Sequence, residues 1–236
     1  ANTWGAYSEL IRVPADWVMP LPEGLDLRSA AGYGTAGFTA AQSVLELEEN
    51  GVAPTAGEIL VTGASGGVGS IAVAILARLG YTVVAATGKA QAREQLERLG
   101  AAVASRDEVQ DDSAKPLLRS RWAGVVDTVG GGILSAALRS TRHGGVVTAC
   151  GNAASGDLPV TVYPFILRGI RLIGIDSAWM NEDRRRAIWE RLAGPWSVGG
   201  LLDELITEVD LDGVDRWIDE ILAGRVRGRI VVRVGS

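Results

Sequence analysis

The chain has 236 residues, 47% of them hydrophobic and 22% charged, and a formal net charge of −5. These values indicate a soluble α/β protein with a sizeable core, without general attraction for nucleic acid or anionic membranes. No apolar run approaches the roughly 18 residues of a membrane span, and the N-terminus carries no signal or transit pattern. We therefore expect a cytoplasmic protein.

The predicted elements change character along the chain. Residues 1–28 contain three prolines between short extended stretches, which predicts irregular β structure, and a helix is predicted at 35–51. Strands are then predicted at 58–64, 82–88, 123–130, 144–151 and 170–176, and helices at 68–80, 90–100 and 133–141. Because continuous Val, Ile and Leu runs suit strands covered on both faces, this alternation predicts a doubly wound parallel sheet.

The last 60 residues carry two predicted helices, 181–194 and 211–224, and a final strand at 227–234. Three consecutive arginines, Arg184 to Arg186, lie in the first of these helices among acidic residues. A solvated helix face is the expected role of this row, rather than a site for a polyanion.

The chain has one histidine, His143, and one cysteine, Cys150. A single cysteine excludes an internal disulfide and suits a reducing compartment. Because zinc takes three or four His, Cys or carboxylate ligands, no metal site is expected. His143 lies in a predicted helix-to-strand turn, where it would cap carbonyls or meet solvent rather than act in catalysis. Cys150 ends a predicted strand and is expected to be a small buried side chain rather than a nucleophile, although it could touch a ligand.

A glycine-rich turn, EILVTGASGGVGS at 58–70, follows the first strand of the predicted sheet. A P-loop is excluded because no lysine follows the glycines. The short-chain dehydrogenase pattern fits Thr62, Gly63, Gly67 and Gly69, but none of the four tyrosines has the lysine four residues later that this class requires. Neither class therefore explains the turn.

The remaining interpretation is the A-x-G-x-x-G form of the dinucleotide turn, with Ala64, Gly66 and Gly69. Gly66 would let the backbone approach a pyrophosphate, and Gly69 would allow close packing of helix on strand. A tight connection without a ligand is the alternative, but the turn stands between a predicted strand and helix, as the motif requires. The turn therefore predicts a dinucleotide cofactor.

The end of the second predicted strand indicates which dinucleotide is bound. NAD requires an acidic residue near this point for the ribose hydroxyls, whereas the sequence offers Thr87, Gly88 and Lys89, with Arg93 one helical turn later. A hydroxyl, a flexible backbone and an ammonium group suit a 2′-phosphate, although Lys89 could also be an ordinary exposed lysine. The pattern predicts NADP(H).

Longer stretches resemble a known superfamily. LPEGLDLRSAAGYGTAGFTA and GEILVTGASGGVGSIAVAILARLGYTVVAATGK resemble the medium-chain dehydrogenases/reductases, in the zinc-free, quinone-oxidoreductase-like branch. ERLGAAVASRDE, WAGVVDTVGG, VVTACGNAASGDLPVTVYPFILRGIRLIGIDS and GRIVVRV are similar to its acrylyl-CoA reductase group. The resemblance runs from about residue 4 to the C-terminus.

The resemblance implies three segments: 1–34 as the end of a GroES-like catalytic domain, 35–176 as a dinucleotide-binding Rossmann domain, and 177–236 as helices and a strand that return to the catalytic domain. The family's longer N-terminal part, which forms most of the GroES-like β-barrel, lies ahead of the matching residues. The chain would then be either a fragment or a natural truncation.

The resemblance also implies a cofactor site. Ser65, Gly66, Gly67 and Val68 would wrap the pyrophosphate, and Thr87, Gly88, Lys89 and Arg106 would hold the adenosine 2′-phosphate. Thr35, Asn152, Ile166 and Ser177 would lie at the nicotinamide end, with Asn152 where the family often has an apolar residue. Cys150 could also touch the nicotinamide. No residue is implied as the proton donor.

The implied reaction is reduction of the C=C bond of an α,β-unsaturated thioester such as acrylyl-CoA, by hydride transfer from NADPH to the β-carbon. Reduction of a quinone or another activated alkene is the alternative within enzymes. A non-catalytic NADPH-binding module is the alternative outside them. A homodimer is expected by analogy with the superfamily, through the apolar stretch GIRLIGID.

Overall fold

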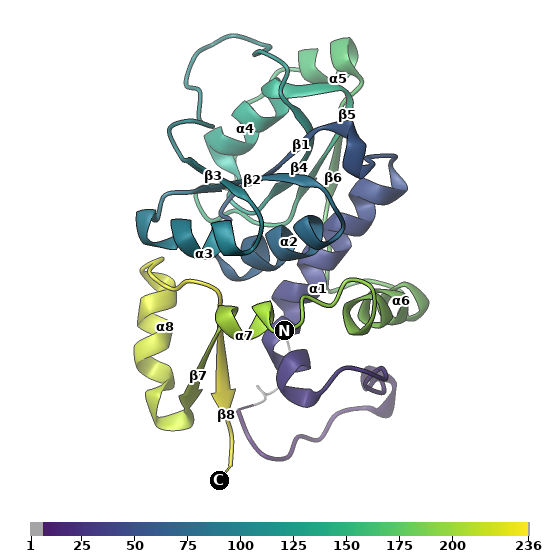
Figure 1. The fold of residues 1–236 in the computed structure, drawn as a ribbon, viewed down its shortest axis with the longest axis vertical. Helices are drawn as coiled ribbons and strands as arrows, with labels where there is room; N and C mark the ends of the chain where they lie inside the picture. The colour runs from purple at the N-terminus through teal and green to yellow at the C-terminus, as the bar shows by residue number, and fades with distance from the viewer. Residues whose placement is uncertain (1–6, 236) are drawn as a thin grey trace.

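The computed structural model describes residues 7–235 and contains a six-stranded parallel sheet in the order β3-β2-β1-β4-β5-β6 (Figure 1). Its strands are β1 Glu58–Val61, β2 Thr82–Thr87, β3 Ala102–Ser105, β4 Trp122–Asp127, β5 Thr141–Ala149 and β6 Arg171–Gly174. The chain runs outward from β1 to β3 and then returns to pair β4 on the other side of β1. A topological switch point therefore lies between β1 and β4, which is where ligands bind in open α/β sheets.

Helices cover both faces of the sheet, and successive strand residues point to opposite faces. The helices are α1 Leu27–Glu49, α2 Gly67–Arg78, α3 Arg93–Arg98, α4 Gly131–Ser140, α5 Tyr163–Arg168, α6 Glu182–Ala193, α7 Leu201–Leu205 and α8 Val214–Leu222. Ile59 and Val61 of β1 pack in the core with α1 and α2, whereas Leu60 packs in the core with α4. All three are completely buried, which explains the continuous apolar run. The predicted parallel sheet is confirmed.

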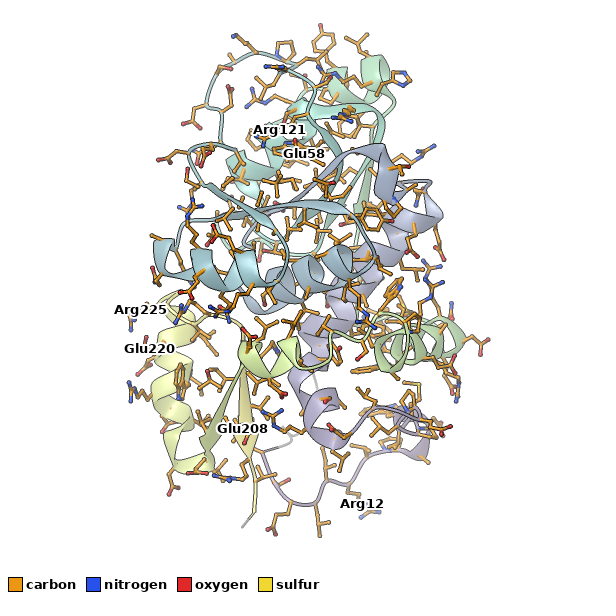
Figure 2. All side chains as sticks on the ribbon, in the orientation of Figure 1. Arg12, Glu58, Arg121, Glu208, Glu220 and Arg225 are labelled. Carbon is orange, nitrogen blue, oxygen red and sulfur yellow. The ribbon has the colours of Figure 1, made fainter. Side chains whose placement is uncertain are left out.

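A second sheet pairs β7 Ile206–Asp210 with β8 Arg229–Arg233 in parallel, and α8 connects the two strands (Figure 1). An arginine at the start of α1 fastens this sheet to the rest of the molecule: Arg28 pairs with Asp203 of α7 and Glu208 of β7. Figure 2 shows Glu208 beside α1, and the Arg225–Glu220 pair at the C-terminal end of α8. No helix within residues 7–235 combines the length and apolar character needed to cross a membrane.

Three predictions at the ends of elements were wrong. Residues 7–26 contain one 3₁₀ turn, Ala15–Trp17, and no strand, so the β structure expected there is absent from this segment. Residues 1–6, where the same expectation applied, lie outside the described part of the chain. Helix α1 begins eight residues earlier than predicted, but it breaks at Gly34, where φ is +47°, and the part after the break begins at Thr35, the predicted start. Strand β5 begins at Thr141, so His143 lies in an exposed, irregular start of that strand instead of in a turn.

Candidate functional site

The predicted site residues gather where the parallel strands end. Ser65 follows β1, Thr87, Gly88 and Lys89 lie at the end of β2, Arg106 follows β3, Cys150 and Asn152 follow β5, and Ser177 follows β6. Because the strands are parallel, all these ends meet at one edge of the sheet. Thr35 lies just after the break of α1, and Gly34 at that break is a neighbour of Arg229, which in turn lies against Gly67.

Ile166 does not lie with the others. It belongs to α5, which precedes β6, and its side chain is exposed. Two residues later, the Arg168 guanidinium donates hydrogen bonds of 2.8 and 2.9 Å to the carbonyls of Arg139 and Thr141, and Thr141 begins β5. This anchors α5 at the amino ends of the strands, the opposite edge of the sheet, and we do not assign Ile166 to the site.

The glycine turn closes tightly and leaves the N-terminus of α2 open. Gly63 has φ +59°, and a Cβ on Gly69 would lie 2.5 Å from the Gly63 carbonyl oxygen, so no larger residue fits at either position. Gly66 is the N-cap of α2, and no side chain caps this end of the helix. The free N–H groups and the positive end of the helix dipole therefore suit an anion.

Hydrogen bonds join this turn to the end of β2 and to the C-terminal segment. The Thr87 hydroxyl donates to Ser65 Oγ at 2.9 Å, and the Gly228 N–H donates to the Ser65 carbonyl at 3.0 Å. The Lys89 ammonium donates to the Val226 carbonyl at 2.5 Å. Three segments distant in the sequence are thus held at one place.

A cavity of about 380 Å³ opens beside the end of β2. It is lined by Thr87, Gly88, Lys89, Ala90, Arg93, Val103, Ala104, Ser105, Arg106 and Asp107. Arg106 lies over Gly88, because a Cβ on that glycine would meet Arg106 Nη2 at 3.1 Å. Three cationic side chains against one carboxylate make the cavity suitable for a dianionic phosphate.

Arg229 is a further residue of this site that the sequence reasoning missed. It begins β8, and a Cβ on Gly67 would lie 3.1 Å from Arg229 Nη1, which places the guanidinium against the N-terminus of α2. Its Nε donates to the Gly32 carbonyl at 3.0 Å, burial lowers its pKa, and no carboxylate of residues 7–235 forms an ion pair with it. A half-buried cation next to the positive end of a helix is stabilised by a bound anion. The only sequence signal was an arginine in the otherwise apolar run GRIVV.

A second missed residue, Asp127, ends β4 at the switch point and is completely buried. Its carboxylate accepts hydrogen bonds from the Thr62 hydroxyl at 2.6 Å and the Gly130 N–H at 2.8 Å, while burial raises its pKa. The Cys150 thiol donates to the Asp127 carbonyl at 3.3 Å, and burial raises the pKa of Cys150 to about 11. The thiol is therefore protonated at neutral pH and unsuited to nucleophilic attack.

Polar side chains remain available near the ends of β5 and β6. Among the described residues, no hydrogen bond involves the side chains of Thr35, Asn152 or Ser177, and Thr35 and Asn152 are exposed. Gln42 of α1 is buried; its amide donates a long hydrogen bond of 3.4 Å to the Asp176 carbonyl, and its Oε1 has no partner. This region can accept a polar group of a ligand.

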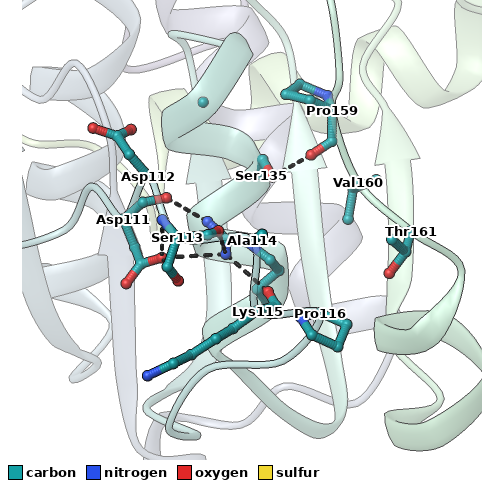
Figure 3. Close-up of a pocket in the computed structure, with 12 residues that line it drawn as sticks. Asp111, Asp112, Ser113, Ala114, Lys115, Pro116, Ser135, Pro159, Val160 and Thr161 are labelled. Carbon is teal, nitrogen blue, oxygen red and sulfur yellow. Dashed lines mark hydrogen bonds and ion pairs between the residues drawn. The ribbon is translucent and has the colours of Figure 1, made fainter.

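A further cavity of about 470 Å³ lies between α4 and the loops at 111–116 and 159–161 (Figure 3). Arg139 of α4 donates to the carbonyls of Ser113 and Lys115, at 2.8 and 2.9 Å, and pairs with Asp111. The Ser135 hydroxyl donates to the Pro159 carbonyl at 2.6 Å. These side chains hold the loops together, and the cavity is separate from the strand ends that carry the predicted residues.

Comparison with known proteins gives the family. A family model described as zinc-binding dehydrogenase matches residues 67–193. YhfP of Bacillus subtilis, named as a quinone oxidoreductase, is 47% identical over 231 residues, which cover 98% of this chain and 70% of that protein. The chain belongs to the medium-chain dehydrogenase/reductase superfamily.

Other relatives in the quinone-oxidoreductase-like branch of this superfamily are equally similar. Acrylyl-CoA reductase AcuI of Ruegeria pomeroyi is 46% identical over 234 residues, 99% of this chain and 71% of that protein. The structure of Escherichia coli K-12 YhdH with bound NADPH has a TM-score of 0.95 at 44% identity, covering 99% of this chain and 72% of that one. The structure of B. subtilis YhfP with NAD bound has a TM-score of 0.90 at 47% identity, covering 94% and 68%.

The resemblance inferred from the sequence, and with it the assignment to an oxidoreductase superfamily, is confirmed. Although the family model is named for zinc, the whole chain holds one histidine and one cysteine. Within residues 7–235, no three His, Cys, Asp or Glu side chains gather in a way that could hold a metal ion.

Proposed function

We propose that this medium-chain reductase uses NADPH to reduce the C=C bond of an α,β-unsaturated acyl thioester such as acrylyl-CoA. The cationic cavity beside the end of β2 carries the cofactor half of the proposal, because the loop after β2 has no acidic side chain for ribose hydroxyls. NADPH in the E. coli relative and the reductase named AcuI support it. NAD in the B. subtilis relative makes the cofactor preference a point to be measured.

The residues present fit NADPH along the strand ends. Ser65, Gly66, Gly67 and Val68 would surround the pyrophosphate at the open end of α2, with Arg229 as its counter-charge. Thr87, Gly88, Lys89 and Arg106 would surround the 2′-phosphate in the cavity beside β2. Thr35, Cys150, Asn152 and Ser177 would lie at the nicotinamide end.

When bound, NADPH supplies the hydride, and the chain's own residues would bind and orient it. The tight turn at Gly63 and Gly69 holds the phosphate-binding N–H groups in place before the cofactor arrives. The thiol of Cys150, whose pKa burial raises to about 11, would offer a neutral surface at the nicotinamide end. We divide these roles among the three segments expected from the resemblance: residues 35–176 bind the cofactor, and 1–34 and 177–236 belong to a catalytic domain.

Two alternatives remain distinct. YhfP, named as a quinone oxidoreductase, favours reduction of a quinone or another activated alkene at the same cofactor site. The chain spans about 70% of the length of these relatives, so a non-catalytic NADPH-binding module is the alternative of another class. A cytoplasmic location also belongs to the proposal, because Cys150 is a free thiol.

The test is NADPH oxidation, followed at the nicotinamide absorbance, with acrylyl-CoA and with a quinone as separate substrates. The protein would be compared with a version that carries the longer N-terminal part found in its relatives. We expect turnover of acrylyl-CoA in at least the longer version. Turnover of the quinone alone would replace the thioester proposal, and NADPH binding without any turnover in both versions would support the non-catalytic module.

A further inference from the structure

The proposed 2′-phosphate cavity contains more positive charge than the sequence pattern assigned to it. Lys89, Arg93 and Arg106 all line it, and Asp107 is the acidic residue among the lining side chains. The sequence pattern points to Lys89 for the phosphate, with Arg93 one helical turn later, and the family resemblance adds Arg106; neither gives Arg93 a role. The hydrogen bonds of the three cations indicate which of them are available to bind a phosphate.

Lys89 is already engaged elsewhere. Its ammonium donates to the Val226 carbonyl at 2.5 Å, in the segment that leads to β8. Burial and the nearby charge of Arg227 lower the pKa of Lys89, which makes its positive charge less favourable than that of an exposed lysine. Neighbouring bonds fix the same segment, because Arg227 Nη1 donates to the Gln91 carbonyl at 2.8 Å. Lys89 therefore serves first as a link between the β2 loop and the C-terminal segment.

The side chains of Arg93 and Arg106 are held less firmly within the protein than that of Lys89. Arg93 begins α3 and forms one ion pair among the described residues, a 3.3 Å contact with Glu97 in which both side chains are about half exposed. Such a surface pair contributes little and is readily exchanged for a better partner. The Arg106 guanidinium forms no hydrogen bond or ion pair within residues 7–235 and already lies over Gly88.

Arg93 also comes close to the loop that carries Arg106. Glu108 of that loop has a lowered pKa, caused first by hydrogen bonds from Ser105 and also by the positive charge of Arg93. Two guanidinium groups thus stand at one cavity, one from the start of α3 and one from the loop after β3. Planar guanidinium groups bind phosphate oxygens in pairs of hydrogen bonds, which a lysine ammonium cannot do.

We infer that Arg93, together with Arg106, recognises the 2′-phosphate of NADPH and determines the preference for NADPH over NADH. Lys89 instead positions the C-terminal segment. The inference rests on the proposed function, since it assigns a residue within the same cofactor site. It predicts that the phosphate-specific part of the affinity follows Arg93, and that the part shared with NADH does not.

The experiment measures dissociation constants for NADPH and NADH by nicotinamide fluorescence, and for 2′,5′-ADP and 5′-AMP by calorimetry. R93Q should weaken NADPH and 2′,5′-ADP by about tenfold or more and leave NADH and 5′-AMP within about twofold. R93K should recover part of the lost affinity, since lysine keeps the positive charge but cannot form the paired hydrogen bonds of a guanidinium group. Circular dichroism checks that each variant is folded, which is expected because Arg93 is exposed.

Two control variants test whether the effect of R93Q is specific to the 2′-phosphate. R229Q removes the proposed pyrophosphate contact and should weaken both dinucleotides alike. R119Q removes an exposed arginine from the loop before β4, which does not line this cavity, and should change neither; it tests whether net charge alone explains the loss.

Two outcomes would overturn the inference: a loss of cofactor preference in K89Q with R93Q unchanged, or equal weakening of NADPH and NADH in R93Q. Failure of the unaltered protein to bind either dinucleotide, or tighter binding of NADH than of NADPH, would instead refute the cofactor choice in the proposed function. The two kinds of failure are therefore distinguishable.

Discussion

Residue identity carries much of the cofactor argument, because a few chemical types meet at the strand ends. Glycines at 63 and 69 leave no room for a side chain, and the loop after β2 offers cations without a carboxylate. The spacing of the second strand end from the glycine turn was enough to predict Lys89, whereas Ser65 and Arg106 were predicted from the family resemblance. Arg229 escaped because its neighbour Gly67 lies some 160 residues earlier, and periodicity or local spacing cannot report such a contact.

Cys150 allows a pH-dependent prediction at this scale. Its raised pKa of about 11 keeps the thiol protonated in the folded protein, whereas the unfolded chain has an ordinary thiol. Alkylation by iodoacetamide at pH 8 should be about 100-fold slower in the native protein than in urea, since the thiolate is the nucleophile. The native rate should rise about tenfold per pH unit toward pH 11.

The same raised pKa has a consequence for stability. As pH rises above the ordinary thiol value, the unfolded chain loses its proton first, so the native state should lose stability between about pH 9 and 11. A Cys150→Ala variant should lack this contribution to the pH dependence of urea unfolding. Equal alkylation rates for folded and unfolded protein at pH 8 would contradict the raised pKa.

Among the elements, long amphipathic helices and fully apolar strands were the ones predicted. The helices α2 and α4 and the strands β1, β2 and β4 have strong patterns, because one helix face or both strand faces are buried. The elements that were missed are short, namely β3, α5, α7 and β7, with four to six residues each. Segments this short show no clear period of 2 or 3.6, and unlike the equally short β1 they carry no continuous buried apolar run.

The break in α1 is the element feature that an exchange of residues can test. Gly34 has φ +47° and ψ −152°, a conformation that residues with a Cβ rarely adopt, and the break places Thr35 at the site. Gly34→Ala should lower the free energy of unfolding by about 1–3 kcal/mol, measured by urea denaturation. Gly132→Ala is the matched control, since Gly132 is an exposed position of α4 where a Cβ would meet nothing within 4 Å, and it should stabilise by about 0.5–1 kcal/mol.

At the scale of the whole molecule, both sheets contribute residues to the proposed cofactor site. The six-stranded sheet presents its strand ends to the second sheet (Figure 1). Arg229, the first residue of β8, and Gly228 just before it lie against the glycine turn. The small sheet and the linking segment at 224–228 therefore form one wall of the proposed cofactor site. Loss of that wall should disturb cofactor binding even though the glycine motif remains intact.

An assembly prediction also belongs to this scale. Strand β6 is an edge strand of the large sheet, and Tyr163, Ile166 and Leu167 of the preceding α5 are exposed. An edge strand can pair with a second copy, and exposed apolar side chains favour such a contact, as the analogy with the superfamily suggests. We expect light scattering to give twice the mass of one chain, and Ile166→Lys to shift the mass toward a monomer. A monomeric mass at micromolar concentrations would exclude the homodimer.

The sequence by itself determined the parallel sheet, the dinucleotide turn and the cations after β2, because each depends on residues close together in the chain. It also identified the superfamily, because its quoted motifs are spread over almost the whole chain. Only the tertiary structure decided that Ile166 lies at the wrong edge, that Lys89 is bonded to Val226, and that Arg229 reaches α2. These depend on how distant segments pack against one another, and packing is set by the whole core rather than by local spacing.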